Sequence, residues 1–137
     1  MKIKLFVIVT NTLISAFLTS NSKPKLAYDK ANELGFLVVS DATFDEFSEV
    51  FIRDKFDKFI SLEIRLKIIN EFKNLVVFLK TNETITACRD PKDNKFLELA
   101  VEAGAACIIT GDNDLLELHP FRNIPIVNAV DFLNMTV

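Results

Sequence analysis

Short runs of consecutive apolar residues alternate along this chain with segments of helical periodicity, and this alternation constrains the fold more than any other feature. We expect strands at residues 2–9, 36–39, 75–79, 106–109 and 124–127, and helices at residues 24–34, 40–53, 61–73, 90–104 and, briefly, near Leu115. Strands that are apolar throughout are typical of a parallel sheet covered by helices on both faces. The sequence therefore predicts an α/β fold, with Pro125 at the edge of the sheet because a central strand would miss its N–H.

The length and charge of the chain limit what it can be. The chain has 137 residues, of which 50% are hydrophobic, and it contains no long linker or repeat, so we expect a single domain over residues 1–137. With a net charge of −3, the chain lacks the positive electrostatic field that holds nucleic acid non-specifically. A phosphate-bearing substrate would need a metal ion or a local basic cluster.

The N-terminal residues resemble a signal peptide, because two lysines precede an apolar run. Thr10-Asn11-Thr12 interrupts that run after Val9, and a membrane span needs about 20 apolar residues. We therefore expect a buried strand there, no membrane segment and a cytoplasmic protein.

The cysteine and histidine content argues against a zinc site. Cys88 and Cys107 stand 19 residues apart without a Cys-x-x-Cys pattern, and His119 is the single histidine. Two reduced cysteines in a cytosolic protein are expected, and His119, beside Pro120, is interpreted as a loop residue without a catalytic role.

Asp93 is the first candidate site residue. Asp90 and Pro91 suit the start of a helix, and Asp93 then falls on the apolar stripe that contains Phe96 and Leu97. Its carboxylate is thus predicted to point inward. The alternative is that it only favours the helix dipole and the free N–H groups of the first turn.

Three further acids follow strands whose carboxyl ends should meet at one edge of the sheet, where open α/β sheets place their sites. Asp112 and Asp114 come directly after the strand ending at Ile109, and Glu46 lies nearer the apolar face of its helix than its acidic neighbours do. A boundary position for Glu46 and ordinary turn chemistry for Thr110-Gly111-Asp112 are the alternatives.

Carboxylates that converge repel one another unless a cation lies between them. Oxygen ligands without cysteine or histidine select a hard ion, Mg²⁺ or Mn²⁺. Such an ion can activate water and neutralise charge on phosphorus, so the pattern predicts metal-assisted phosphodiester cleavage.

Four segments carry a resemblance to a known family. They are Thr10 to Ala16, Ser40 to Val50, Arg89 to Ala100 and Thr110 to Leu116, of which the last two together are the most specific. On these segments the chain resembles the PIN domain family, and within it the VapC-like toxins of toxin–antitoxin pairs. The resemblance implies a three-layer α/β/α sandwich with a central, mainly parallel sheet of four to five strands.

The resemblance also implies an activity and its residues: a Mg²⁺- or Mn²⁺-dependent endoribonuclease that acts on RNA, is restrained by a cognate antitoxin and often forms a homodimer. Glu46, Asp93 and Asp112 would be catalytic and hold the metal, with Asp114 as an accessory ligand. The supporting residues would be Asn11, which hydrogen-bonds within the site, together with Thr10, Ser15 and Thr110.

The chain departs from the family pattern at one corner of the expected site. The family has aspartate immediately before Thr-Asn, whereas this chain has Val9, which offers no lone pair to a metal. An attenuated ribonuclease is one interpretation, and a catalytically inactive PIN-like module that binds protein or RNA is the other. A nucleotide-binding module is disfavoured, because no glycine-rich loop follows the first strand.

Other side chains are candidates for contacts with partners. The basic residues near the expected site either contact RNA phosphates or belong to a solvated surface; they are Arg53, Lys55, Lys92 and Lys95. The spacing of a phenylalanine group indicates core residues, some of which could face a dimer or antitoxin groove; the group is Phe44, Phe47, Phe51, Phe56 and Phe59.

Overall fold

The computed structural model describes residues 3–137, and within them five strands form one parallel sheet in the order β3-β2-β1-β4-β5. The strands are β1 (Lys4–Ile8), β2 (Gly35–Val39), β3 (Val77–Phe78), β4 (Cys107–Ile109) and β5 (Ile126–Val127). The predicted parallel α/β sheet is confirmed. Pro125 directly precedes the edge strand β5, and its carbonyl accepts a hydrogen bond from Ile108 N–H at 2.9 Å.

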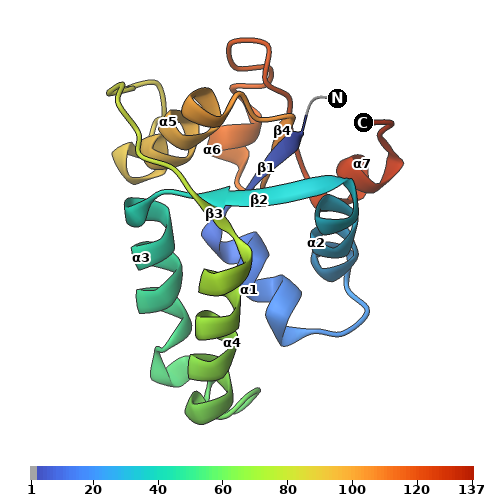
Figure 1. The fold of residues 1–137 in the computed structure, drawn as a ribbon, viewed down its shortest axis with the longest axis vertical. Helices are drawn as coiled ribbons and strands as arrows, with labels where there is room; N and C mark the ends of the chain where they lie inside the picture. Colours follow the sequence, from blue (N-terminus) through green and yellow to red (C-terminus); the bar gives the residue numbers. More distant parts are fainter. Residues whose placement is uncertain (1–2) are drawn as a thin grey trace.

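Helices cover both faces of this sheet, which gives the expected three-layer sandwich (Figure 1). The α-helices are α1 (Thr10–Leu18), α2 (Lys23–Leu34), α3 (Asp41–Phe51), α4 (Leu62–Leu75), α5 (Asn94–Ala103), α6 (Asn113–Leu116) and α7 (Ala129–Asn134), and two 3-10 helices are η1 (Asp54–Phe56) and η2 (Pro91–Asp93). α1 to α4 and α7 pack on one face, and α5 and α6 pack on the other.

The alternation of side chains along each strand explains why the strands are apolar throughout. In β1, Phe6 points into the core beneath α1 to α4, whereas Val7 points into the core beneath α5. Both side chains are fully buried. A strand covered on both faces must bury successive residues, so a continuous apolar run is what the fold requires.

Two helices were not predicted from the sequence. The apolar run resumes at Leu13 after Thr10-Asn11-Thr12, so the helical periodicity of this segment is hidden, yet Thr10 to Leu18 forms α1 with Val9 at the N-cap. α7 is only six residues long, and it forms because Phe132 packs edge-on against Phe6, with ring centroids 5.6 Å apart.

The other predicted elements are present with shifted ends. Residues 40–53 form the shorter helix α3, because Ser40 caps it from outside, and residues 90–104 split into η2 and α5. The tighter η2 turn places Asp93 just before the α-helix instead of on its apolar stripe. Ser61 caps α4 as predicted, and Gly104 ends α5 in the left-handed conformation.

In residues 3–137, no helix has the length and apolar character needed to cross a membrane. Cys88 and Cys107 are both buried and free. Burial raises the pKa of the Cys107 thiol to about 12, so this thiol stays protonated at neutral pH.

Candidate active site

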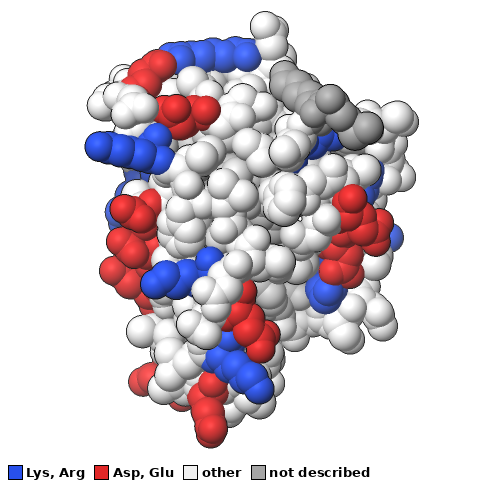
Figure 2. Space-filling view, viewed as in Figure 1, with Lys and Arg blue, Asp and Glu red and all other residues white. Residues whose placement is uncertain are grey.

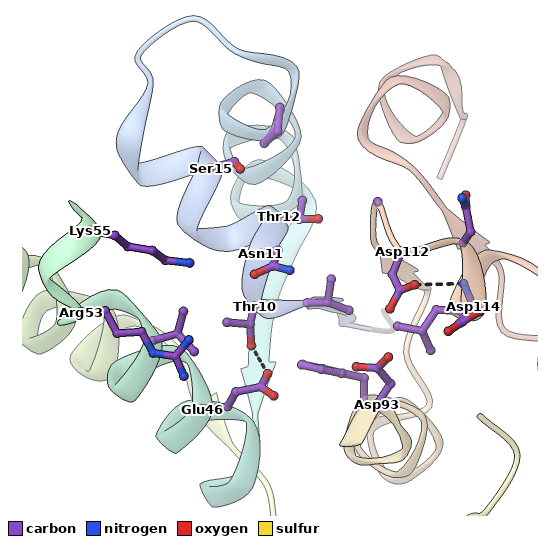
Figure 3. Close-up of a pocket in the computed structure, with 17 residues that line it drawn as sticks. Thr10, Asn11, Thr12, Ser15, Glu46, Arg53, Lys55, Asp93, Asp112 and Asp114 are labelled. Atoms are coloured by element: carbon purple, nitrogen blue, oxygen red, sulfur yellow. Dashed lines mark hydrogen bonds between the residues drawn. The ribbon is translucent and has the colours of Figure 1, made fainter. Parts of the chain in front are cut away.

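A cleft of about 850 Å³ opens at the carboxyl ends of the parallel strands. β1 leads into it through Val9 and Thr10, β4 through Gly111 and Asp112, and α3, which follows β2, contributes Glu46. Its walls are Val9, Thr10, Asn11, Thr12, Ser15, Pro24, Glu46, Val50, Arg53, Lys55, Asp93, Phe96, Gly111, Asp112, Asn113, Asp114 and Leu115. Glu46, Asp93, Asp112 and Asp114 therefore lie around one cavity, although they come from distant parts of the chain (Figure 3).

Asp93 and Asp112 form the most strongly interacting pair of carboxyl groups in the cleft. Burial, followed by hydrogen bonding to Asp112 and the negative charge of Asp112, raises the pKa of Asp93 to about 7. Asp90 and Glu46 add smaller contributions in the same direction. Two carboxyl groups that share a site in this way retain a proton near neutral pH unless a cation replaces it.

The turn after β4 fixes the position of Asp112. Its N–H donates to the hydroxyl of buried Thr110 at 3.0 Å, and its Oδ1 accepts from the N–H of Asp114 at 2.9 Å. The turn chemistry considered as an alternative from the sequence is thus present, and the same turn also aims Asp112 into the cleft. Thr110 supports Asp112 through this contact.

Glu46 is held from two sides. The hydroxyl of Thr10 donates to Oε2, and the ammonium group of Lys95 donates to Oε1 at 2.8 Å. Asp45 and Glu49, its acidic neighbours on α3, are exposed, whereas Glu46 is half-buried, as its place on the helix predicted. Both oxygens of Glu46 thus have partners within the protein.

The sequence did not indicate the contact between Lys95 and Glu46. A lysine in the first turn of a helix ordinarily lies on a solvated surface, and 49 residues separate it from its partner. Lys92, in contrast, is exposed and forms no salt bridge within residues 3–137.

Val9 lines the cleft at the end of β1. Its side chain is buried and packs in the same apolar cluster as Phe96 and Leu115. It is also the N-cap of α1 and makes no side-chain cap to that helix. An acidic residue here could offer an oxygen to the cleft and cap the helix, whereas the valine side chain has no atom for either role.

Within residues 3–137, no three Asp, Glu, His or Cys side chains come close enough together to hold one ion. The donor set nevertheless fits a hard divalent cation at the pair Asp93 and Asp112. Carboxylate oxygens suit Mg²⁺ and Mn²⁺, and Mg²⁺ in proteins commonly keeps several waters. Burial, hydrogen bonding to Asp112 and the charge of Asp112 together raise the pKa of Asp93, and a cation at this pair would compensate the negative charge.

The remaining expected residues have separate positions. Asn11 and Ser15 line the cleft on exposed faces of α1. His119 does not line the cleft, and its Nδ1 atom accepts a hydrogen bond from the N–H of Ile126 at 2.9 Å, which is a structural role. Phe47 and Phe51 belong to the core, whereas Phe59 is 60% exposed.

Comparison with known proteins identifies the relatives of this chain. The family model described as PIN domain matches residues 6–114. The uncharacterized protein MJ1680 of Methanocaldococcus jannaschii is 36% identical over 121 residues, which are 86% of this chain and 77% of that protein.

Two solved structures share the fold. The structure of VapBC2 from Rickettsia felis, bound to a DNA fragment from their promoter, matches with a TM-score of 0.62 at 10% identity and covers 90% of this chain and 98% of that chain. PAE2754 from Pyrobaculum aerophilum matches with a TM-score of 0.61 at 11% identity, over 97% of this chain and 91% of that chain.

Proposed function

This chain belongs to the PIN domain family, and from that membership we propose that it is a divalent-metal-dependent endoribonuclease of reduced activity, the toxin of a toxin–antitoxin pair. The observation that carries the proposal is the pairing of Asp93 with Asp112 in a cleft at the carboxyl ends of parallel strands. Such a pair favours uptake of a cation, and a cation there allows an acidic cleft to accept a polyanion.

Asp93 and Asp112 would hold Mg²⁺ or Mn²⁺, with Asp114 beside them as an accessory group. The bound ion would neutralise charge on the scissile phosphate and activate the attacking water. Glu46, held by Thr10 and Lys95, lines the same cleft, and its carboxylate would accept a hydrogen bond from the attacking water. Thr110 keeps Asp112 in place through its contact with the Asp112 N–H.

Val9 is the reason for reduced activity. It removes one carboxylate from the set that the family pattern provides, so the ion is held by fewer protein oxygens. Displacement of a reacting group by about 1 Å can cost ~10²-fold in rate.

The test compares the wild-type chain with Val9→Asp and Val9→Asn in Mn²⁺-dependent cleavage of a structured RNA. Both variants lose the buried valine and gain a side chain able to cap α1, so they differ mainly in charge. We expect cleavage to rise at least about tenfold in Val9→Asp and not in Val9→Asn. Equal rates in all three proteins would show that position 9 is not a corner of the metal site.

The second candidate function is a catalytically inactive PIN-like module that binds protein or RNA. Val9 specifically favours it, because the family's first acidic group is absent from the cleft. Absence of cleavage by the wild type and by Val9→Asp, with RNA binding retained, would select this function over the first.

A protein partner is part of the proposal. Large apolar side chains on β2, α4 and β3 are exposed, including Phe36 at 47%, Leu75 at 55% and Phe78 at 39%. Figure 2 shows a broad uncharged area over β2 and β3. We propose that the protein acts in the cytoplasm as a homodimer restrained by an antitoxin, and exposed apolar area of this kind suits either interface. Light scattering of the purified chain, with and without Phe36→Ser, tests the dimer.

A further inference from the structure

The cleft has a basic wall that faces its acidic one. Arg53 and Lys55 follow the end of α3 and line the cleft on the side of Glu46. Figure 3 shows both side chains extending toward the cavity from the left, whereas Asp112 and Asp114 lie at the right. The two kinds of charge are therefore separated across the same opening.

Both basic side chains are available to a ligand. They are exposed, and among residues 3–137 neither forms a salt bridge. Lys55 rests over the ring of Phe56, with Nζ 5.1 Å from the ring centroid. This contact orients the ammonium group and leaves its charge uncompensated by any carboxylate.

A buried arginine holds this wall in place. Arg65 of α4 is fully buried, and its guanidinium donates to the carbonyl oxygen of Phe51 at 2.6 Å and to that of Arg53 at 3.1 Å. It also donates to the carbonyl of Ile60 at 3.0 Å and to the carboxylate of Asp57. Burying a charge is costly unless its donors are paired, and here the partners are almost all backbone of residues 51–60.

The position of this arginine was readable in part from the sequence. Arg65 shares a helical face with Ile68, Ile69 and Phe72, so it lies on the buried stripe of its helix. A cation on such a stripe must find acceptors, and the acceptors it finds belong to the segment that carries Arg53 and Lys55. Arg65 therefore fixes where that segment enters the cleft.

We propose that Arg53 and Lys55 form a phosphate-binding subsite for the RNA backbone beside the scissile phosphate, and that Arg65 is its positioning residue. The proposal rests on the proposed ribonuclease function and deepens it. A chain of net charge −3 with an acidic cleft repels RNA, so binding requires local positive charge. A guanidinium also fits two phosphate oxygens at once, which gives the strand a defined path from the basic wall to Asp93 and Asp112.

The first experiment measures binding of a fluorescein-labelled 12-nucleotide single-stranded RNA by anisotropy in EDTA at several salt concentrations. We expect the double variant Arg53→Gln/Lys55→Gln to bind at least about tenfold more weakly at low salt, with the slope of log K against log[salt] reduced by about 1.4, because two contacts to a single strand are lost. The matched control is Lys58→Gln/Lys67→Gln, which removes two exposed positive charges outside the cleft. Equal losses in both double variants would overturn the subsite.

The second experiment tests the positioning role with Arg65→Gln. We expect the same reduction in salt slope as in Arg53→Gln/Lys55→Gln, with Mn²⁺ binding at Asp93 and Asp112 retained in calorimetry. An unchanged salt slope in a folded Arg65→Gln would refute the positioning role, whereas loss of both Mn²⁺ and RNA binding would mean that the variant is misfolded and that Asp57→Asn decides the question.

Asp57→Asn covers the case in which Arg65→Gln does not fold. It leaves Arg65 in place and removes only its carboxylate partner, which is 56% exposed, so we expect RNA binding to weaken about two- to threefold. Unchanged binding in Asp57→Asn would count against the positioning role.

The outcomes separate this inference from the proposed function. RNA binding that depends on Arg53 and Lys55 but leads to no cleavage would retain the subsite and overturn the ribonuclease. Cleavage that is unaffected by Arg53→Gln/Lys55→Gln would retain the ribonuclease and overturn the subsite.

Discussion

Replacing Asp93 with asparagine should stabilise the metal-free protein at pH 8. The rise in the pKa of Asp93 from 3.8 to about 7 means that its ionised form is disfavoured in the folded state. At 1.36 kcal/mol per tenfold change in ionisation, this rise corresponds to about 4 kcal/mol. Solvent screening of a half-exposed carboxylate reduces that figure to about 1–2 kcal/mol. For a domain of this size we expect the melting temperature to increase by about 4–8 °C.

The sign of the pH dependence follows from linkage. A carboxyl group with a raised folded-state pKa keeps its proton in the folded protein after the unfolded chain has lost its own. Asp93 therefore does not lower the free energy of unfolding of the wild type below about pH 4. Its destabilising effect grows as the pH rises from about 4 to about 7. At pH 5 the gain from Asp93→Asn should be less than half of its value at pH 8.

The assay is thermal unfolding in EDTA at pH 5 and pH 8, followed by circular dichroism. Asp45→Asn is the control, because Asp45 is exposed on α3 outside the cleft. A repeat at pH 8 with Mn²⁺ should raise the melting temperature of the wild type and leave that of Asp93→Asn nearly unchanged. Identical melting temperatures of wild type and Asp93→Asn in EDTA at pH 8 would refute the conclusion that burial and the neighbouring Asp112 disfavour the ionised form of Asp93.

Three further predictions test other parts of the structure. Lys95→Gln should raise the affinity for Mn²⁺ by roughly three- to tenfold in calorimetry, because it frees Glu46 and removes a nearby positive charge, whereas Lys92→Gln should change it less. Gly35→Ala should destabilise the protein by at least about 2 kcal/mol in urea unfolding, because its Cβ would lie 1.9 Å from the carbonyl oxygen of Lys4, and Gly111→Ala, with nothing within 4 Å, should be close to neutral. Phe132→Ala should cost about 3–5 kcal/mol by removing a fully buried ring, so a loss below 1 kcal/mol, as expected for exposed Val130→Ala, would show that α7 is not part of the core.

Local patterns in the sequence predicted most elements and several of their ends. Ser61 and Gly104 mark helix ends because capping depends on a few neighbouring residues. Thr10-Asn11-Thr12 interrupts the apolar run after Val9, and the same polar residues start α1, which the sequence did not reveal. The helical periodicity of apolar residues cannot be recognised where a mostly apolar helix closely follows an apolar strand.

The sequence by itself determined that the chain is an α/β protein and which acids follow which strands, because side-chain periodicity and turn chemistry act over a few residues. Only the tertiary structure decided that β1 lies between β2 and β4, and with it that Asp93 meets Asp112 while Glu46 meets Lys95. The same holds for Arg65, whose acceptors are carbonyls of another segment. These contacts join residues far apart in the chain, and their formation depends on how the helices pack on the sheet, which no local pattern specifies.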